Sequence, residues 1–552
     1  MMKRPIILIG GLFVVVAALV VFGLRFGSRA QTSTGYDALV ALFDEMRESQ
    51  RAPVVDGVPD YSPAAVQARR AKLDELGQRL DAFDSRRWPI AQRVDHLLVI
   101  TQWRSLDFEH RVTHPWTRDP GLYVDMVGRV PFTRLPAEGE ALAELQTWLR
   151  AVPAILNEAR TNLTEGAGEL TLQAIRNLEK ADGVGHGHPW RPTPPPGVIG
   201  WYDDLREQAS KHHSDLVPEV EKAKAAVTVF RDWLVENKAR LNAPAGIGLD
   251  NYTYFQRYVR LMPFTAEDNL RLGERELNRS RAFLAIARNK NRNLPPLEPA
   301  PTEEEYTRRK QEADREIREF VQSESILTIP EYIKELDTNV PWIIRPGGKR
   351  NFWEEIQYRD PRPDHLHAVI PGHRFDGIVH RHDKRPIRGR YSDGGRSEGW
   401  GFYLEEMFLQ AGLLDQRPRT KELFYLFQIK RASRNKAEVK MHANEFTVED
   451  AVKSMMDNVE FLDYDVARVD AEIYLRRAGY GSGYQMGKLQ MDQLLSDRYQ
   501  QLGSRFNLKE FHDQFLAAGT IPISAIRWEM TGMDDEVRDL WKRWPSALMT
   551  RR

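Results

Sequence analysis

The chain has 552 residues, in which 79 lysines and arginines balance 79 aspartates and glutamates, and it contains no cysteine. The zero net charge argues against nucleic acid as a partner, because phosphate binding usually needs a basic excess or a basic stripe. The lack of cysteine excludes disulfides, thiolate nucleophiles and cysteine-ligated zinc.

The first 30 residues carry an export or anchoring signal. Lys3 and Arg4 precede an uninterrupted apolar run from Ile6 to Leu24. This run is long for the core of a signal peptide and just long enough to cross a bilayer. Ser28 and Ala30 add a weak small-x-small cleavage signal. We therefore expect residues 1–30 to be a cleaved signal peptide or, as the length favours, a membrane anchor, and the protein to be exported: membrane-anchored, periplasmic or extracellular.

Residues 31–552 are predicted to form a mainly α-helical domain. Apolar residues recur at helical spacing in a first run, Tyr36, Leu39, Leu42 and Phe43, and in a second run, Val66, Leu73, Leu76 and Leu80. Proline and glycine mark loops at residues 53–63, 113–120 and 183–197. His186 and His188 fall in the last of these loops, where an exposed turn is favoured over a metal site.

Two charged helices and one strand are predicted in the middle of the chain. Residues 265–289 form a helix that Thr265 caps, with acidic side chains in the first turn. Residues 303–319 form another helix, whose mixed charges indicate a solvated face. The pattern from Val340 to Ile344 predicts a strand, so a small sheet is expected as well.

Histidines concentrate in one short segment. Five of the fourteen histidines lie between His365 and His382, and Glu398 follows His373 after 25 residues. Two imidazoles and a carboxylate from the next helix are the ligand set of a catalytic zinc, which keeps a fourth position for water. The alternative is a group of histidines that hydrogen-bond in a polar crevice. Surface positions are expected for His380 and His382, among Lys384, Arg385 and Arg388.

The spacing between His367 and His373 makes a structural demand. Six residues on an ideal helix place two side chains about 120° apart, so both can face one ion only if the helix is interrupted between them. Pro371 and Gly372 lie at the right place to interrupt it.

The C-terminal third returns to a series of helices. The predicted ranges are 399–411, 420–437, 447–457, 463–478 and 483–498.

Two motifs resemble the signature of a bacterial family, domain of unknown function 885. Pro-Gly-His at 371–373 and Glu-Gly-Trp at 398–400 match its H-E-x-x-P-G-H, followed by E-G-W-A-x-Y-x-E. Residues 111–121, 248–252 and 506–512 are similar to the family too, so the resemblance covers nearly everything after the N-terminal segment. Members resemble α-helical gluzincin peptidases such as carboxypeptidase Taq and the oligopeptidases. The resemblance implies a large zincin-like body with two lobes around a deep cleft. It also implies that the protein hydrolyses peptides.

The same resemblance implies the site residues. His367 and His373 correspond to the first and second zinc ligands, and Glu398 to the third. The general-base glutamate of the family would stand at position 368, where this chain has Ala368. In this chemistry the carboxylate takes a proton from zinc-bound water and passes it to the leaving amine, which alanine cannot do.

Other carboxylates lie close in sequence to the missing glutamate. They are Asp364, Asp376 and Glu405, and none of them is at the required position.

A second motif matches the family in part. The family has R-Y-x-x-x-P-G-Q-A-x-x-Y, of which this chain keeps Tyr474, Gly479 and Tyr484. It departs from the pattern at Ile473, Ala478 and Tyr480. The resemblance implies that Tyr484 is the catalytic phenol that donates to a developing oxyanion. The alternative is a tyrosine at a helix start with its ring in the core.

Three functions are compatible with this sequence. The first is a zinc hydrolase acting on a peptide or small-molecule substrate with an altered base, in a cleft lined by residues 365–376 and 398–406. The second is a pseudo-peptidase that binds a peptide or envelope partner without cutting it. The third is a structural envelope protein. Ala368 favours the second, whereas the retained zinc-ligand residues and Tyr484 favour the first. The expected partners also include a membrane, through the N-terminal helix.

Overall fold

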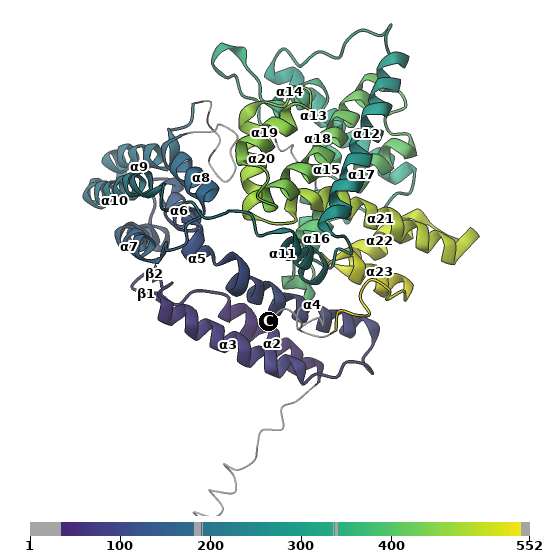
Figure 1. The fold of residues 1–552 in the computed structure, drawn as a ribbon. Coiled ribbons are helices and arrows are strands. Elements are labelled where there is room, and N and C mark those ends of the chain that lie inside the picture. Colours follow the sequence, from purple (N-terminus) through teal and green to yellow (C-terminus); the bar gives the residue numbers. More distant parts are fainter. Residues whose placement is uncertain are drawn as a thin grey trace, which may run out of the picture.

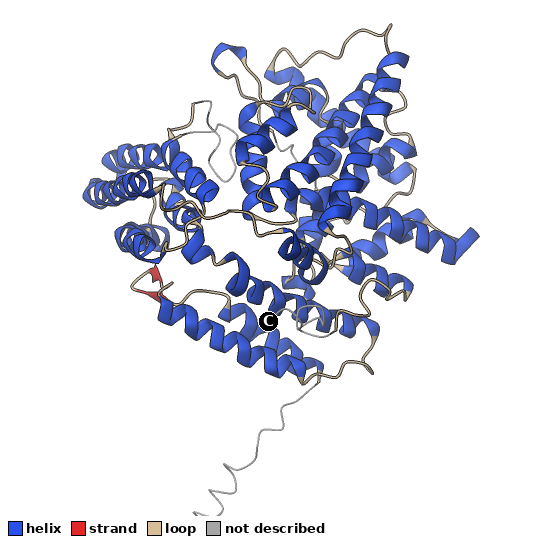
Figure 2. Cartoon of the chain, in the orientation of Figure 1, coloured by secondary structure: helices blue, strands red, loops and turns tan. Residues whose placement is uncertain are grey.

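The computed structural model describes residues 35–180, 189, 191, 193–334, 336 and 340–541. The predicted signal or anchor at residues 1–30 lies outside this part, as do His186 and His188. Within the described ranges, no helix combines the length and the apolarity needed to cross a bilayer. The mainly α-helical class is confirmed, and Figure 2 shows helices throughout these ranges.

The elements follow one another in three groups along the chain. The first group comprises α2 (Tyr36–Ser49), β1 (Val54–Val55), β2 (Val58–Pro59), α3 (Pro63–Asp81), α4 (Ile90–Phe108) and η1 (Glu109–Thr113). The second comprises α5 (Pro115–Arg118), α6 (Pro120–Gly128), η2 (Val130–Phe132), α7 (Gly139–Asn162), α8 (Gly168–Glu179), α9 (Gly197–His212), η3 (Ser214–Leu216) and α10 (Val217–Asn237).

The third group is the longest and carries the histidine segment. It comprises α11 (Leu249–Tyr254), η4 (Phe255–Val259), α12 (Ala266–Lys290), α13 (Glu303–Ser323), η5 (Pro346–Gly348), α14 (Phe352–Arg359), α15 (Arg362–Ala368), α16 (His373–Arg381), η6 (Arg388–Arg390), α17 (Gly394–Ala411), α18 (Pro418–His442), α19 (Val448–Met456), α20 (Tyr464–Arg476), α21 (Tyr480–Leu502), η7 (Gly503–Arg505), α22 (Leu508–Ala518) and α23 (Ile523–Thr531).

Several apolar cores hold the helices together, and they do not all follow the three groups. Helices α6 to α10 share a core among themselves, which makes them a lobe of their own, the α6–α10 lobe. The N-terminal helices α2 to α4 instead share a core with α17, α22 and α23, although hundreds of residues separate them in sequence. A third core joins α14 to α18, α19 and α20. Figure 1 shows the α6–α10 lobe to one side of the helices that follow α11.

The small sheet lies elsewhere than predicted. Strands β1 and β2 pair antiparallel inside a stretch that the sequence predicts as a loop. The turn between them is Asp56-Gly57, and both residues have positive φ, as a two-residue type I′ hairpin requires. The strand predicted at Val340 to Ile344 is wrong. There the amide of Ile343 donates to the hydroxyl of Tyr358 at 2.9 Å, so a side chain takes the place of a strand partner.

The predicted helices are confirmed with shifted bounds. Thr265 caps α12 and forms a reciprocal capping box with Asp268, because each side chain accepts from the other's backbone amide. The charged helix at 303–319 is α13 and continues to Ser323. The five C-terminal predictions correspond to α17 to α21, of which α17 begins five residues earlier than expected, at Gly394.

Candidate metal centre

The chain reverses between the two predicted histidine ligands. Helix α15 ends at Ala368 and α16 begins at His373, so the interruption falls at Pro371 and Gly372 as predicted. A Cβ atom at Gly372 would overlap the carbonyl oxygen of His367, which explains why glycine occupies this position. The indole nitrogen of Trp400 donates to the carbonyl of Pro371 at 3.0 Å and ties the reversal to α17.

This reversal brings the three predicted ligand residues together. The Nε2 atoms of His367 and His373 lie 3.1 Å apart, with their rings nearly perpendicular. Oε2 of Glu398 lies 3.1 Å from Nε2 of His373 and 3.3 Å from Nε2 of His367. One ligand atom from each of the three residues therefore points at the same small volume.

Close packing of α17 against α21 brings Glu398 next to two tyrosines. Gly395 and Gly399 of α17 face Gly483 and Gly487 of α21. A Cβ atom at Gly487 would lie 2.7 Å from the Cα of Gly399, so the two backbones touch where larger residues would separate them. Glu398 on α17 and the tyrosines at the start of α21 become neighbours as a result.

Helix α17 also supports the ring of His367 from behind. Oε1 of Glu405 lies 2.9 Å from Nδ1 of His367, although the contact is not aligned as a hydrogen bond. A Cβ atom at Gly401 would lie 2.7 Å from the same Nδ1, so the imidazole rests directly on the helix backbone. A carboxylate beside the second nitrogen of a ligand histidine is the usual outer support of a metal site.

Two tyrosines at the start of α21 face the centre. The hydroxyl of Tyr480 donates to Oε1 of Glu398 at 2.7 Å. The ring of Tyr484 stacks on that of His367 at 5.8 Å. The guanidinium groups of Arg434 and Arg431 lie 4.4 Å and 5.5 Å from the centroid of the Tyr484 ring. Tyr484 is thus both close to the candidate ligands and packed in the core.

The charges of the centre are strongly coupled. Burial alone would raise the pKa of Glu398, but His373 and His367 beside it hold that pKa well below its ordinary value. Burial opposes a positive charge on His373, but the Glu398 carboxylate outweighs it and raises the pKa of the ring. The negative charge of Glu398 also raises the pKa of Tyr480, whose hydroxyl therefore stays protonated and acts as a donor.

The nearby carboxylates each have a partner of their own. Asp364 accepts a hydrogen bond from Gln357. Asp376 pairs with Arg396, and Glu405 pairs with Arg431. All three carboxylates are buried. Position 368 itself is a buried alanine at the last residue of α15.

The remaining histidines of the segment lie outside the centre. His365 is buried and its Nε2 lies 3.0 Å from Oδ1 of Asp314. His382 is exposed and stacks on Tyr332, as expected of a surface residue, whereas His380 is half-buried and bonds to Thr520. Arg388, named with these histidines as a neighbour, is buried and pairs with Asp95.

Solvent reaches the centre from one side. The His373 side chain is 32% exposed, whereas His367 and Glu398 are buried. The predicted cleft along residues 365–376 and 398–406 stays a prediction. Two hollows lie elsewhere on the described surface. One of about 310 Å³ lies beside α16, from Asp376 to Arg385, and does not include the ligand residues.

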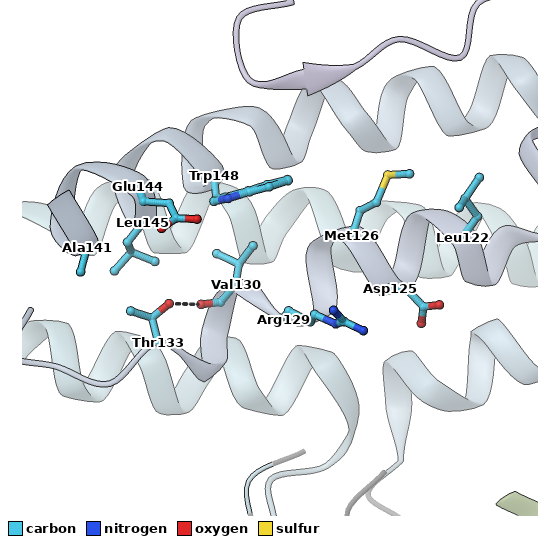
Figure 3. Close-up of a pocket in the computed structure, with 10 residues that line it drawn as sticks. All are labelled: Leu122, Asp125, Met126, Arg129, Val130, Thr133, Ala141, Glu144, Leu145 and Trp148. Atoms are coloured by element: carbon cyan, nitrogen blue, oxygen red, sulfur yellow. Dashed lines mark hydrogen bonds between the residues drawn. The ribbon is translucent and has the colours of Figure 1, made fainter. Parts of the chain in front are cut away.

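The other hollow lies in the α6–α10 lobe and is larger, about 580 Å³. Figure 3 shows Trp148, Met126 and Leu122 along its apolar side, with Arg129 and Asp125 on the side opposite. Its lining contains neither histidine nor cysteine, so it lacks the imidazole and thiolate donors that favour zinc.

Sequence reasoning missed three partners of this centre. Gly401, Glu405 and Tyr480 were not connected with the ligands. Glu405 had a usable signal: it follows Glu398 by seven residues, or two helical turns, and so shares its face of α17. No sequence signal indicated the contact of Tyr480 with Glu398, because these residues are 82 positions apart in the chain.

Comparison with known proteins supports one family. The profile of a family described as "Bacterial protein of unknown function (DUF885)" matches residues 47–341 and 365–530, and the second segment contains all three candidate ligands. No curated protein matches the chain.

Two solved structures share the fold. One is described as "a putative lipoprotein of unknown function" from Shewanella oneidensis; it has a TM-score of 0.69 and 17% identity, over 90% of this chain and 99% of its own. The other is described as "the putative lipoprotein" from Colwellia psychrerythraea; it has a TM-score of 0.66 and 15% identity, over 91% and 99% of the two chains.

Proposed function

Since the chain belongs to the bacterial DUF885 family, we propose that it is an exported, zinc-dependent, metallopeptidase-like hydrolase that acts on peptides without the usual general base. The observation that carries this proposal is the convergence of His367, His373 and Glu398 on one point. Such a convergence brings two imidazoles and a carboxylate into contact at a cost in desolvation that a bound cation would offset.

The donor set fits zinc. Two imidazole nitrogens and one carboxylate oxygen are the protein ligands of many catalytic zinc sites, with metal–ligand distances of about 2.0–2.2 Å. Glu405 behind His367 and Tyr480 beside Glu398 supply the outer contacts that orient such ligands. Zinc bound there would lower the pKa of a water and polarise a substrate carbonyl.

The other residues account for part of a peptidase reaction. Burial raises the pKa of Tyr484, so its phenol stays protonated and can donate a hydrogen bond to an oxyanion. The exposed edge of His373 gives the substrate a side from which to approach. No side chain at position 368 can move the proton, and we therefore expect slow hydrolysis.

A specific observation favours a second candidate, a pseudo-peptidase that binds a peptide or an envelope partner. Asp364, Asp376 and Glu405 each pair with another side chain, which makes them poorer replacements for the glutamate, although Oε2 of Glu405 accepts no hydrogen bond from the described residues. In that case the ion and its surroundings hold a peptide carbonyl or carboxylate without cleaving the chain.

The proposed export rests on the N-terminal sequence and on the fold relatives. Both structural neighbours are described as lipoproteins. The 552 residues contain no cysteine, so they offer no thiol for a lipid. We therefore propose that the run from Ile6 to Leu24 provides any membrane attachment.

Metal analysis and a peptide screen test the function together. The purified full chain should hold about one zinc ion per molecule, and His373→Ala and Glu398→Ala should lose it. Peptide turnover should be slow and should disappear in both variants. His382→Ala is the matched control, because His382 is an exposed histidine outside the centre.

The outcomes separate the candidates. A chain that takes up no zinc at micromolar free metal would overturn both. Zinc uptake with peptide binding but no turnover would favour the pseudo-peptidase. Fast turnover that His373→Ala abolishes would show that another group acts as the base.

A further inference from the structure

The two oxygens of Glu398 have different surroundings. Oε2 faces the imidazoles of His373 and His367, at 3.1 Å and 3.3 Å. Oε1 faces the other way and accepts the hydrogen bond from the Tyr480 hydroxyl at 2.7 Å. Only one of the two oxygens is therefore directed at the point where the three candidate ligands meet.

Tyr480 is fixed where it can make this contact. It is the first residue of α21 and follows Gly479, which has a φ of +79°. A Cβ atom at Gly479 would lie 2.5 Å from Nε2 of Gln256, so the turn is closely packed. The rings of Tyr474 and Tyr484 lie 6.2 Å and 5.9 Å from that of Tyr480.

A second contact holds the start of α21. The buried carboxylate of Glu438 accepts a hydrogen bond from the backbone amide of Ser482 at 2.5 Å. A carboxylate at this position stabilises the first turn of a helix. The Tyr480 hydroxyl thus extends from a closely packed helix start.

A carboxylate can bind a metal ion through one oxygen or through both. Binding through both would occupy an additional position on a small ion such as zinc, which in catalytic sites keeps one position for water or substrate. A strong donor on the second oxygen prevents this, because that oxygen would lose its hydrogen bond on turning toward the ion.

We propose that Tyr480 is a positioning residue of this centre: its hydroxyl holds Glu398 as a one-oxygen ligand and so keeps the fourth position of the ion open. This inference rests on the proposed function, because it requires an ion at the three ligands. Tyr480 stands where the resembled family pattern has glutamine, so the device belongs to this chain's own sequence.

The test removes the hydroxyl and follows the ion. Tyr480→Phe in the full chain should weaken zinc binding about 10- to 100-fold, as loss of an outer contact usually does. The cobalt(II)-loaded variant should also show weaker visible absorption than the natural protein, because intense bands accompany four-coordinate cobalt and weaken as the coordination number rises. A purely structural role for the hydroxyl would not produce this spectral change.

Two matched proteins control for altered folding. Tyr474→Phe removes a buried hydroxyl from a neighbouring ring that has no hydrogen bond to Glu398, and its cobalt spectrum should remain that of the natural chain. Replacing Tyr480 by p-aminophenylalanine keeps a donor on the same ring and should restore zinc affinity. Should Tyr480→Phe misfold, this second variant still tests the donor directly.

The failures can be told apart. If the natural chain binds zinc, and Tyr480→Phe binds it equally well with an unchanged cobalt spectrum, the role of Tyr480 is overturned and the zinc site stands. If the natural chain binds no zinc, the proposed function and this inference fall together.

Discussion

At the scale of single residues, position 368 has the largest expected effect on chemistry. It directly follows the candidate ligand His367, and its alanine is buried at the end of α15. Proton transfer by a placed side chain contributes about 10²–10⁴-fold to rates of this kind. We expect Ala368→Glu to raise peptide turnover within that range, measured as kcat/KM at saturating zinc.

A glutamine at the same position separates charge from bulk. Ala368→Gln has nearly the same shape as Ala368→Glu but takes up no proton, so it should give no gain. Equal activity of both variants would contradict the role of the base.

Gly401 gives a second prediction at this scale. A Cβ atom there would lie 2.7 Å from Nδ1 and 2.8 Å from Cε1 of His367, too close for either atom to stay in place. The resembled family signature has alanine at this position, whereas this chain has glycine. Gly401→Ala should weaken zinc binding roughly ten-fold by turning the ring, as changes behind a ligand commonly do.

Competition with a chelating dye measures that affinity. Gly377→Ala is the control, because a Cβ atom at Gly377 of α16 would have ordinary room: it would lie 3.8 Å from Nη1 of Arg381. Unchanged affinity in Gly401→Ala would mean that α15 moves instead of the ring.

The sequence identified the three central residues but not their supports. The family resemblance implied His367, His373 and Glu398 as a set, and ligand chemistry and the break at Pro371-Gly372 were compatible with it. Tyr480 could not be found, because its role depends on how α21 packs against α17. That packing joins segments about eighty residues apart, on which local patterns carry no information.

At the scale of elements, the contact between α17 and α21 decides whether the centre can form. Gly395 and Gly399 face Gly483 and Gly487 at backbone distance. Gly399→Ala or Gly487→Ala would insert a methyl group where the backbones already touch. We expect each to lower the free energy of unfolding by about 1–3 kcal/mol, the usual cost of overpacking.

Chemical denaturation of the metal-free proteins measures this difference. The same Gly377→Ala control should be neutral or slightly stabilising, because alanine favours a helix over glycine by up to about 1 kcal/mol where there is room. If Gly399→Ala behaves like this control, the two helices are less tightly coupled than their packing implies.

Helices were the elements that sequence patterns predicted best. Apolar periodicity and caps such as Thr265 identified α12 and the C-terminal helices within a few residues. The strand at Val340 to Ile344 was wrong because Tyr358, distant in sequence, satisfies that backbone. The β1–β2 hairpin was missed because strands of two residues leave almost no alternation to detect.

At the scale of the whole molecule, we expect buried histidines to reduce stability in acid. Burial lowers the pKa of His96, His442 and His512 to about 4 in each case, from an ordinary value near 6.5. His512 donates from Nδ1 to the carbonyl of Ile326 and accepts at Nε2 from Tyr403, an arrangement that suits the neutral ring.

The sign of the pH effect follows from those values. The unfolded chain binds protons at these histidines near pH 6.5, whereas the folded chain does so only near pH 4. Their contribution is therefore complete above pH 6.5 and is lost as the pH falls toward 4, by roughly 3 kcal/mol for each ring. Melting temperatures from pH 7 to pH 4 should show this loss.

One substitution tests whether His512 causes the loss of stability in acid. His512→Gln should flatten the acid part of the profile, whereas His382→Gln, at an exposed histidine, should leave it unchanged. A profile that keeps its slope in His512→Gln would assign the loss to carboxylates instead.

The ion pairs of Arg476 connect α20 to α6 of the α6–α10 lobe. Its guanidinium lies 2.8 Å from Asp119 and 2.9 Å from Asp125, so the last residue of α20 pairs with the N-cap of α6 and with a residue inside α6. Asp125 also lines the hollow of Figure 3, and Tyr480 follows Arg476 by only four residues. Arg476 therefore couples the α6–α10 lobe to the turn that leads into Tyr480, and we expect a shift of α6 to be transmitted to this tyrosine.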